Sequence, residues 1–448
     1  MSTAAGAAGP DPEPDGEAVT RRAPFSANPT VGARGQRTQQ RILDAALEVF
    51  GEVGYHQCSI DRVAKTAGCS RISFYQYFSG KEDVFRHLGR QVLQQIAALG
   101  DGLGPVTPDE AGWSALRDWV AGYDEVHQRF APVFAVFQAA LSNDESIARP
   151  SQRAGDRNVA RFRARMAPPA LPARRVDGVT DLALKTTTAA FGVAATLRRA
   201  HPEAWPHERV DDALADILHR SLFGLMPDVN VHAAARRRPP RVPFGPAMQE
   251  VLDTRLDGSD LTPAGRRTLD ALLDAGRTQL VTRGYHGTRV DDIATAADLS
   301  HGAFYRYFEN KDQFARLVAG QAMRTVSLAL TEIPVETVHD GAGGRDALRE
   351  WLRRYNAAQS TETALVRVWA DATAADPALR AESAAVFDWG RRRMAGFLQP
   401  RGFGDVDTEA VAMLALLEAY GARPRDAAAT DTAALLIEQG FLGRPAVP

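Results

Sequence analysis

The chain repeats itself after 230 residues. The segment SFYQYFSGK at 73–81 returns as AFYRYFENK at 303–311. A second match, ALRDWVAGY at 115–123 with ALREWLRRY at 347–355, extends the repeat well beyond that motif. Solenoid repeats have periods of about 20–50 residues, far shorter than this one. The sequence therefore predicts two diverged tandem copies of one whole unit, and any fold proposed for one copy must also suit the other.

Length and composition agree with a multidomain globular protein. The chain has 448 residues, which is too many for one ordinary core, and it is 45% hydrophobic and 24% charged. No apolar run approaches the roughly 20 residues of a membrane span, and the N-terminus, rich in Ala, Pro and Gly, lacks the apolar segment of a signal peptide. Two cysteines, Cys58 and Cys69, make neither a disulfide framework nor a four-ligand zinc site. We therefore expect a cytoplasmic protein without metal or other cofactor.

The net charge of −2 hides a local bias. Arg and Lys exceed Asp and Glu by three over residues 34–90 and by one over residues 264–320. Both segments are mildly basic within a slightly acidic chain. That balance permits contact with nucleic acid without indicating it strongly.

Apolar residues recur with helical spacing in both copies. In the first copy the pattern predicts a helix that ends at Gly54, a short helix after Ser59, a third helix capped by Ser70, and a longer one from Lys81 to about Leu99. The second copy repeats this plan, with Ser300 capping a helix over 301–308. Strand-like alternation is absent from both halves. The predicted fold class is all-α.

Two short helices separated by a tight turn describe a helix-turn-helix. Small residues, Ala64 and Ala67, would let the first helix pack closely on the second, and Phe74 and Phe78 would point into the core. The second helix must be slim and polar outside to enter a major groove about 12 Å wide. Its outward positions are Arg71, Ser73 and Gln76, and Tyr75 and Tyr77 carry hydroxyls suited to phosphate oxygens.

GYHQCSIDRVAKTAGCSRISFYQYFSGK and GYHGTRVDDIATAADLSHGAFYRYFENK resemble the DNA-binding domain of TetR-family transcriptional regulators. The resemblance implies an operator-binding three-helix reader followed by a helical bundle that binds a small ligand and forms dimers. In the first copy it places Ser59, Ser70, Arg71, Ile72, Ser73, Tyr75, Gln76, Tyr77 and Lys81 at the DNA surface. In the second copy the matching set is Arg289, Ser300, His301, Gly302, Ala303, Tyr305, Arg306, Tyr307 and Lys311.

The copies depart from the family pattern in different ways. Ile72 replaces the usual glycine, which either hinders close approach or touches a thymine methyl. In the second copy Asp298 replaces the turn glycine, and His301 and Ala303 offer weaker readout than Arg71 and its neighbours. We expect the first copy to read DNA and leave the second open.

The expected organisation follows from the repeat. It comprises a disordered tail (1–35), a first helix-turn-helix domain (36–90), a first helical regulatory domain (91–226), a proline-containing basic linker (227–261), a second helix-turn-helix domain (262–320) and a second helical regulatory domain (321–448). Two arrangements remain open. The copies form a pseudo-dimer within one chain, or each pairs with its counterpart in another chain.

Other candidate sites are weaker. DDALAD (211–216) resembles a diphosphate-binding carboxylate cluster, but its spacing is DDxxxD and the sequence shows no partner cluster or basic diphosphate pocket, so a solvated helix face is favoured. Aromatic residues form a candidate ligand cavity, with ordinary core packing favoured: Trp119, Tyr123, Phe134, Phe137, Trp351, Tyr355 and Trp369. No catalytic motif is present, so an enzyme is not expected.

Two functions remain. The favoured one is a transcriptional regulator, and we expect it to be a ligand-responsive repressor. Its expected partners are double-stranded DNA and an unidentified small molecule. The alternative is a ligand-binding or interaction protein in which the second helix-turn-helix, or both, no longer binds DNA.

Overall fold

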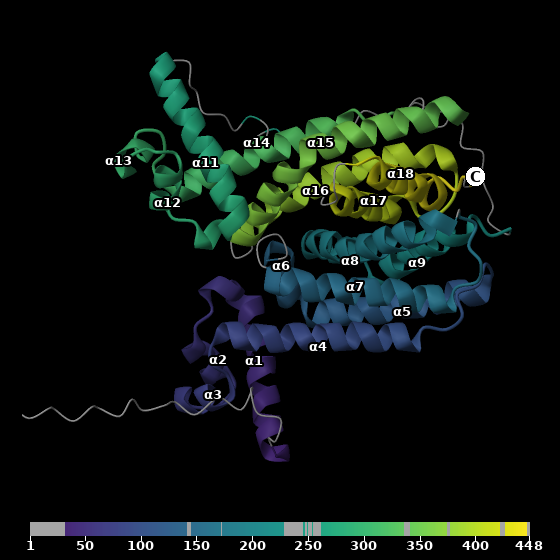
Figure 1. Ribbon diagram of the computed structural model, residues 1–448, viewed down its shortest axis with the longest axis horizontal. Coiled ribbons are helices and arrows are strands. Elements are labelled where there is room, and N and C mark those ends of the chain that lie inside the picture. The colour runs from purple at the N-terminus through teal and green to yellow at the C-terminus, as the bar shows by residue number, and fades with distance from the viewer. Residues whose placement is uncertain are drawn as a thin grey trace, which may run out of the picture. The chain divides into compact units, whose positions relative to one another are not determined.

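The chain is described here from a computed structural model, shown in Figure 1. It describes residues 32–140, 145–171, 173–227, 245–246, 249, 253, 261–335, 341–373, 377–421 and 426–445. Over these ranges the chain is helical, and the one β-type pairing is an isolated parallel bridge between Val106 and Met166. The all-α prediction is confirmed. Within the same ranges, no helix has the length and apolar character needed to cross a membrane. The predicted tail (1–35) and linker (227–261) lie largely outside the described residues.

The first copy is a run of nine α-helices in the described ranges. They are α1 (Ala33–Gln57), α2 (Ile60–Thr66), α3 (Arg71–Tyr77), α4 (Lys81–Gly102), α5 (Glu110–Arg129), α6 (Ala131–Ala140), α7 (Glu145–Arg165), α8 (Val176–Ala200) and α9 (His207–Phe223), with short 3₁₀ turns η2 (Ala173–Arg175) and η3 (Pro202–Ala204). Gly54 interrupts the helical geometry of α1 with a φ of 76°, as its place at the end of the apolar pattern predicts.

The second copy repeats the same order. Its helices are α11 (Pro263–Gly287), α12 (Val290–Ala296), α13 (His301–Phe304), α14 (Lys311–Thr331), α15 (Gly341–Thr373), α16 (Pro377–Leu398), η4 (Gln399–Arg401), α17 (Val406–Gly421), α18 (Ala427–Leu436) and η5 (Ile437–Phe441). Gly284, at the repeat position of Gly54, breaks α11 in the same way with a φ of 69°. The repeat seen in the sequence is therefore a repeat of local structure.

The chain divides into two compact units. The first contains residues up to Ala46 together with Ser59–Arg86, and so holds the helix-turn-helix of the first copy. The second contains Leu47–Cys58 and everything from His87 onward. The regulatory helices of both copies and the second helix-turn-helix therefore belong to one unit.

One continuous apolar core runs through the second unit and takes side chains from both copies. Leu182 and Phe191 of α8 belong to it, together with Leu416 and Tyr420 of α17, and all four are buried. Helices α8 and α9 of the first copy lie beside α17 and α18 of the second (Figure 1). Burial of this apolar surface is the main term that holds the regulatory halves together.

Three ion pairs join the two copies within the described ranges, and each takes its arginine from the first copy. Arg220 Nη2 lies 2.6 Å from Glu409 Oε2, and both side chains are buried. Arg401 of the second copy also contacts Glu409, with 2.6 Å between Nη1 and Oε2. The other two pairs are Arg209 with Asp405 at 2.6 Å and Arg175 with Asp431 at 2.7 Å.

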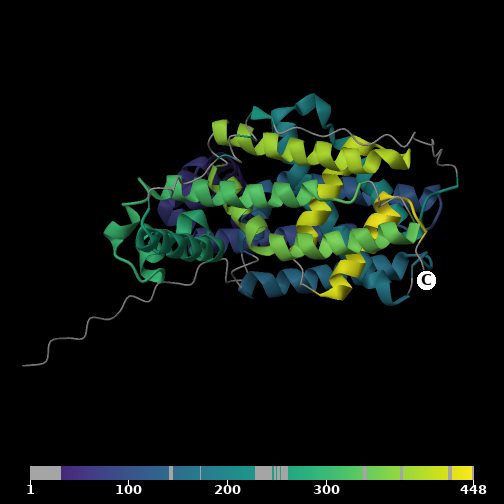
Figure 2. The same ribbon diagram turned by 90° about the horizontal axis from the view of Figure 1, so that it is seen from above.

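A separate apolar cluster holds the second helix-turn-helix on its regulatory helices. Phe304, Phe308 and Phe314 pack together in it, and Leu365 and Trp369 of α15 close it. Helices α14, α15 and α16 run alongside one another next to this cluster (Figure 2). Packed side chains therefore join α14 and α15 to the second helix-turn-helix.

Candidate nucleic-acid interface

The first helix-turn-helix is fixed by side-chain caps and a glycine turn. Ser59 Oγ accepts a hydrogen bond from the Arg62 amide (3.3 Å) at the start of α2. Gly68 turns the chain with a φ of 62°, and the next amide, Cys69 N–H, donates to Ala64 O over 2.9 Å. Ser70 Oγ then accepts from the next helix's Ser73 amide (3.1 Å) and starts α3.

The inner face of α3 packs as predicted. Phe74 and Phe78 are 1% and 0% exposed, and their ring centroids are 6.0 Å apart. Val63 and Ala64 of α2 are buried as well. The apolar side chains thus set the angle between α2 and α3 and leave the opposite face of α3 to solvent.

Arg71, the first residue of α3, forms an ion pair that the sequence did not predict. Arg71 Nη1 lies 3.1 Å from Asp61 Oδ2, and the guanidinium is 5.8 Å from the centre of the Tyr75 ring. Hydrogen bonding to Tyr75 and the nearby Asp61 raise the pKa of Arg71. The second copy holds an equivalent contact, since Asp291 precedes His301 by the same ten residues and contacts it.

The remaining predicted DNA-facing residues of the first copy differ in exposure. Ile72 is 77% exposed, the largest fraction among the large hydrophobic side chains of the described residues. Ser59, Ser70 and Gln76 are exposed, whereas Ser73, Tyr75, Tyr77 and Lys81 are half-buried. These side chains all lie within the first compact unit, so one unit presents the whole set.

The second helix-turn-helix has the same turn conformation as the first, but a different residue provides it. Asp298, at the repeat position of Gly68, has a φ of 54°, and Leu299 N–H donates to Ala294 O over 2.9 Å. Asp is one of the few L-residues that tolerate this left-handed conformation. The substitution therefore keeps the turn and adds a carboxylate beside the reading helix.

The predicted helix over 301–308 is wrong in length, since α13 ends at Phe304 after one turn. The predicted side-chain cap is also absent, because Ser300 makes no cap hydrogen bond to the helix. Instead Ala303 N–H donates to the Ser300 backbone oxygen (2.9 Å). Gly302 stands where the first copy has Ile72, and glycine is a poor helix former. Tight turns with i to i+3 bonding replace the longer helix.

Several predicted DNA-facing residues of the second copy are engaged inside the protein. Ala303 is buried, and the Tyr307 hydroxyl donates to Gly265 O over 2.9 Å. His301 Nδ1 contacts Asp291. The exposed members of the predicted set are Arg289, Ser300, His301, Gly302, Tyr305 and Arg306.

Lys311 is engaged in a different way from the phosphate contact implied by the resemblance. Its Nζ donates to Tyr285 O (2.9 Å) and Thr288 O (3.1 Å) and lies 4.1 Å from the centre of the Tyr285 ring. Burial lowers the pKa of Lys311. A phosphate contact remains a prediction, and it requires the ammonium group to leave these two carbonyls.

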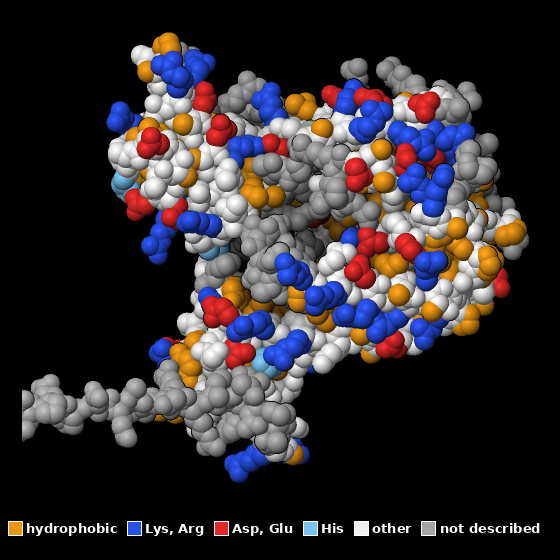
Figure 3. Space-filling view, viewed as in Figure 1, with side chains coloured by type: hydrophobic (Ala, Val, Ile, Leu, Met, Phe, Trp, Pro, Cys, Tyr) orange, Lys and Arg blue, Asp and Glu red, His pale blue; other side chains and the backbone are white. Residues whose placement is uncertain are grey.

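Charges around the second reader are mixed. Arg283 Nη1 lies 2.8 Å from Asp292 Oδ1, and Asp291 is occupied by His301. On the face shown in Figure 3, basic side chains over this region alternate with acidic ones rather than forming one patch. The electrostatic attraction to a polyanion is therefore expected to be weaker here than in the first copy.

The predicted ligand-lining aromatics fall mostly in the core. Trp119, Tyr123, Trp351 and Tyr355 are each less than 7% exposed and belong to the large apolar cluster, and Phe134 packs against it. Trp351 Nε1 donates to Ala329 O (3.0 Å), and burial raises the pKa of Tyr123 to about 12. The side chain of Phe137 lies outside the described residues. Core packing accounts for these positions.

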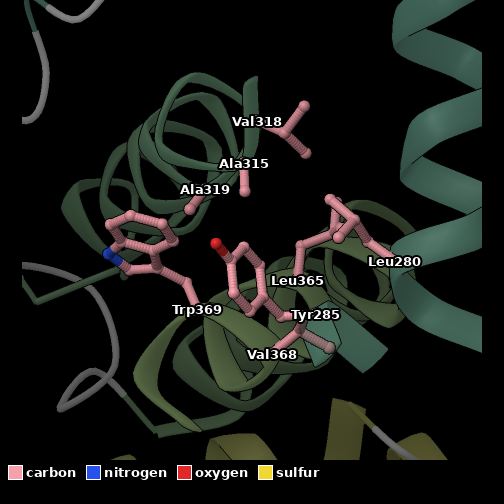
Figure 4. Close-up of a pocket in the computed structure, with 8 residues that line it drawn as sticks. All are labelled: Leu280, Tyr285, Ala315, Val318, Ala319, Leu365, Val368 and Trp369. Carbon is pink, nitrogen blue, oxygen red and sulfur yellow. The ribbon is translucent and has the colours of Figure 1, made fainter. Parts of the chain in front are cut away.

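Trp369 differs, because it lines a small cavity between α11, α14 and α15. Tyr285 and Trp369 project toward this cavity, and Leu280, Ala315, Val318, Ala319, Leu365 and Val368 complete its lining (Figure 4). Its volume is about 10 Å³, close to the minimum for one water molecule. Ligand pockets are typically about 300–1,000 Å³, so a ligand here would have to open the packing around the second reader.

The DDALAD segment is not the solvated face that was expected. Asp211 is buried, and Asp216 accepts a hydrogen bond from Trp113 Nε1 (2.7 Å). Burial and the charge of Asp124 raise the pKa of Asp211 to about 7. Only Asp212 stays mostly exposed, paired with Arg117 at 3.0 Å. No cluster of His, Cys, Asp and Glu within the described ranges is arranged to hold a metal ion.

Comparison with known proteins agrees with this geometry. The profile of the bacterial regulatory proteins of the tetR family matches the chain twice, at residues 42–88 and 272–318. Both matches cover the helix-turn-helix segments described above. They span α2–α3 in the first copy and α12–α13 in the second.

Individual relatives match in the same way. The HTH-type transcriptional regulator SrpR of Pseudomonas putida is 34% identical over 121 residues, 25% of this chain and 51% of that protein. TtgW, an uncharacterized HTH-type transcriptional regulator of the same species, is 34% identical over 121 residues, 25% of this chain and 81% of that protein. The HTH-type transcriptional repressor AcnR of Corynebacterium diphtheriae is 33% identical over 85 residues, 18% of this chain and 45% of that protein.

The chain thus spans about half the length of SrpR and most of TtgW. The duplicated profile match places a helix-turn-helix of the same family in each half. With these two segments, the chain belongs to the TetR family of bacterial regulatory proteins.

Proposed function

We propose that the protein is a sequence-specific DNA-binding repressor whose first reader provides most of the base recognition. The observation that carries this proposal is the exposed outer face of α3, held by the Ser70 cap and by the buried Phe74 and Phe78. A helix of this kind is the element that helix-turn-helix proteins place in the major groove. Among the relatives, AcnR is itself named a repressor.

The test is selection of bound fragments from random duplex DNA with the full chain, followed by affinity measurement at several salt concentrations. A DNA reader gives an enriched sequence, and its affinity falls as salt rises because phosphate contacts release counterions. Arg71→Ala is expected to weaken binding to the selected duplex by about 1–3 kcal/mol if its guanidinium leaves Asp61 for a base. His301→Ala is the matched variant in the second reader. Absence of any enriched sequence favours the alternative, a ligand-binding or interaction protein.

The two regulatory halves, we propose further, form a pseudo-dimer within one chain. The support is the shared core of α8 with α17 and the one-directional ion pairs between copies. In this arrangement the copies supply two unlike reading heads, so the preferred operator is asymmetric. A covalent link also keeps the second head at high effective concentration.

Sedimentation of the full chain tests the pseudo-dimer. A mass of 48.5 kDa that does not change on dilution, and one chain per selected duplex, agree with pairing within the chain. A species of twice that mass that binds two duplexes would establish the rival arrangement with four reading heads.

Release by a small molecule is the remaining part of the proposed function. Its support is the apolar cavity beside the second reader, where α14 and α15 pack against α11. Opening this cavity would move α14, which begins directly after the second reading turn. Trp369→Ala, which enlarges the cavity, tests the idea: it should change the DNA affinity of the full chain, whereas Leu328→Ala on the exposed surface of α14 should not.

A further inference from the structure

Ile72 has an unusual place for an apolar side chain. It is the second residue of α3 and is 77% exposed, compared with 48% for Tyr305 and 46% for Leu328. Single exposed apolar residues are ordinary on protein surfaces. This one, however, stands on the first turn of the reading helix, where helix-turn-helix proteins contact base edges.

The neighbours of Ile72 make contacts within the protein, whereas Ile72 itself is exposed. Arg71 is drawn aside by Asp61, 3.1 Å away, and lies near the Tyr75 ring. Ser73 uses its amide for the Ser70 cap, and its side chain is half-buried. A β-branched side chain such as Ile has few χ1 rotamers in a helix and loses little freedom on contact.

The major groove offers one apolar group at the base edges, the C5-methyl of thymine. We infer that Ile72 is a specificity residue that selects a thymine by packing against this methyl group. The inference rests on the proposed function of the first reader. It assigns a base to a position at which the family pattern has glycine.

The second copy offers a natural comparison. Gly302 corresponds to Ile72 at the shift of 230 residues and has no side chain to place against a methyl group. The requirement for thymine is therefore expected in the half of the operator that the first reader contacts. The two halves of the operator would then differ in composition as well as in sequence.

The experiment uses the full chain and the duplex enriched by selection. Each thymine in turn is replaced by deoxyuridine, which removes only the methyl group, and affinity is measured by fluorescence anisotropy. One position should bind about fourfold more weakly, which corresponds to about 0.8 kcal/mol for one buried methyl group. Cytosine at that position should bind more tightly once it is methylated at C5.

Variants connect the effect to Ile72. In Ile72→Ser the ratio of thymine to deoxyuridine affinity at that position should fall to about one, whereas Ile72→Val should retain it. The side chain is exposed, so the melting temperature of Ile72→Ser should equal that of the parent. Gly302→Ile should add a new deoxyuridine-sensitive thymine in the other half of the duplex.

The experiments distinguish failure of the Ile72 assignment from failure of the proposed function. If the duplex binds in a salt-dependent manner and no thymine responds to deoxyuridine, or if the response persists in Ile72→Ser, the assignment of Ile72 is wrong and DNA reading stands. If no duplex is enriched at all, the proposed function fails and the assignment fails with it.

Discussion

Asp298 shows how one residue keeps a turn while changing its chemistry. Its φ of 54° is the conformation that Gly68 supplies in the first copy, where the φ is 62°. For most L-residues this left-handed region costs about 1–2 kcal/mol, but Asp and Asn enter it more readily. The second reader therefore retains its geometry and gains a negative charge that the first reader lacks.

Two substitutions separate backbone conformation from charge at this turn. Asp298→Ala should lower the free energy of unfolding by about 1 kcal/mol, because alanine resists a positive φ. Asp298→Asn should leave it nearly unchanged. Denaturant unfolding of the full chain measures both. Equal losses in the two variants would show that the carboxylate, and not the backbone, stabilises the turn.

Asp211 leads to a second prediction, which concerns how the stability of the protein depends on pH. Its folded pKa is raised to about 7 by burial and by Asp124, whereas a free Asp titrates near 3.9. The folded chain thus holds a proton that the unfolded chain releases, and this group's contribution to stability declines as pH rises from about 4 to about 7.

Asp211→Asn should accordingly stabilise the protein by about 1–2 kcal/mol at pH 8 and by much less at pH 4.5, allowing for partial screening by solvent. Urea unfolding at the two pH values measures the difference. Asp212→Asn, on the exposed neighbour, is the control and should change little at either pH. A gain for Asp211→Asn that is independent of pH would contradict the assigned titration.

At the scale of elements, the two reading helices illustrate how local chemistry sets helix length. Helix α3 has a side-chain cap from Ser70 and runs over seven residues, whereas α13 lacks the cap from Ser300 and has four. Gly302 in α13 also weakens the helix where α3 has Ile72. The first reader is therefore the more rigidly preformed of the two.

Removing each serine tests this difference. Ser70→Ala should cost about 1 kcal/mol, because an N-cap hydrogen bond to Ser73 is lost. Ser300→Ala should cost only a few tenths, since no such bond exists. Amide hydrogen exchange over residues 71–77 and 301–307 reports the two helices separately. A comparable increase in exchange in both segments would contradict the structural difference.

Sequence alone predicted the helices of the first reader and the helix order of the second, because apolar spacing and the glycines Gly54 and Gly284 are local signals. The burial of Phe74 and Phe78 followed from the same spacing. Asp61 with Arg71 and the interior position of Asp211 were not predicted, since each depends on contacts between helices. The short length of α13 was not predicted, because the repeat suggested a copy of α3. Gly302 disfavours the helix despite that similarity.

At the scale of the whole molecule, the ion pairs between the copies that the structure describes are directional: in each of the three, the first copy supplies the arginine and the second copy the carboxylate. Glu409 accepts from both Arg220 and Arg401 at 2.6 Å, and all three side chains are buried. A buried charge cluster of this kind contributes more to the choice of partner than to net stability.

Substitutions of Glu409 and of Arg220 should therefore lower the free energy of unfolding by different amounts. Glu409→Val should cost about 3 kcal/mol or more, because Arg401 then loses its paired carboxylate and, within the described residues, Arg220 keeps only Asp216 at 3.4 Å. Arg220→Gln should cost about 1–2 kcal/mol, because Arg401 still neutralises Glu409. Chemical denaturation gives both values. Losses of equal size would show that the cluster does not act through Glu409.

The pairing of Glu409 with an arginine of the other copy has a consequence for heredity. In an assembly of identical chains, one codon change alters two places at once. In the proposed pseudo-dimer this contact occurs once in the chain, so a point mutation at Glu409 alters one place and a single second mutation can compensate for it. Each half of the gene is thereby free to change while the other half stays as it is.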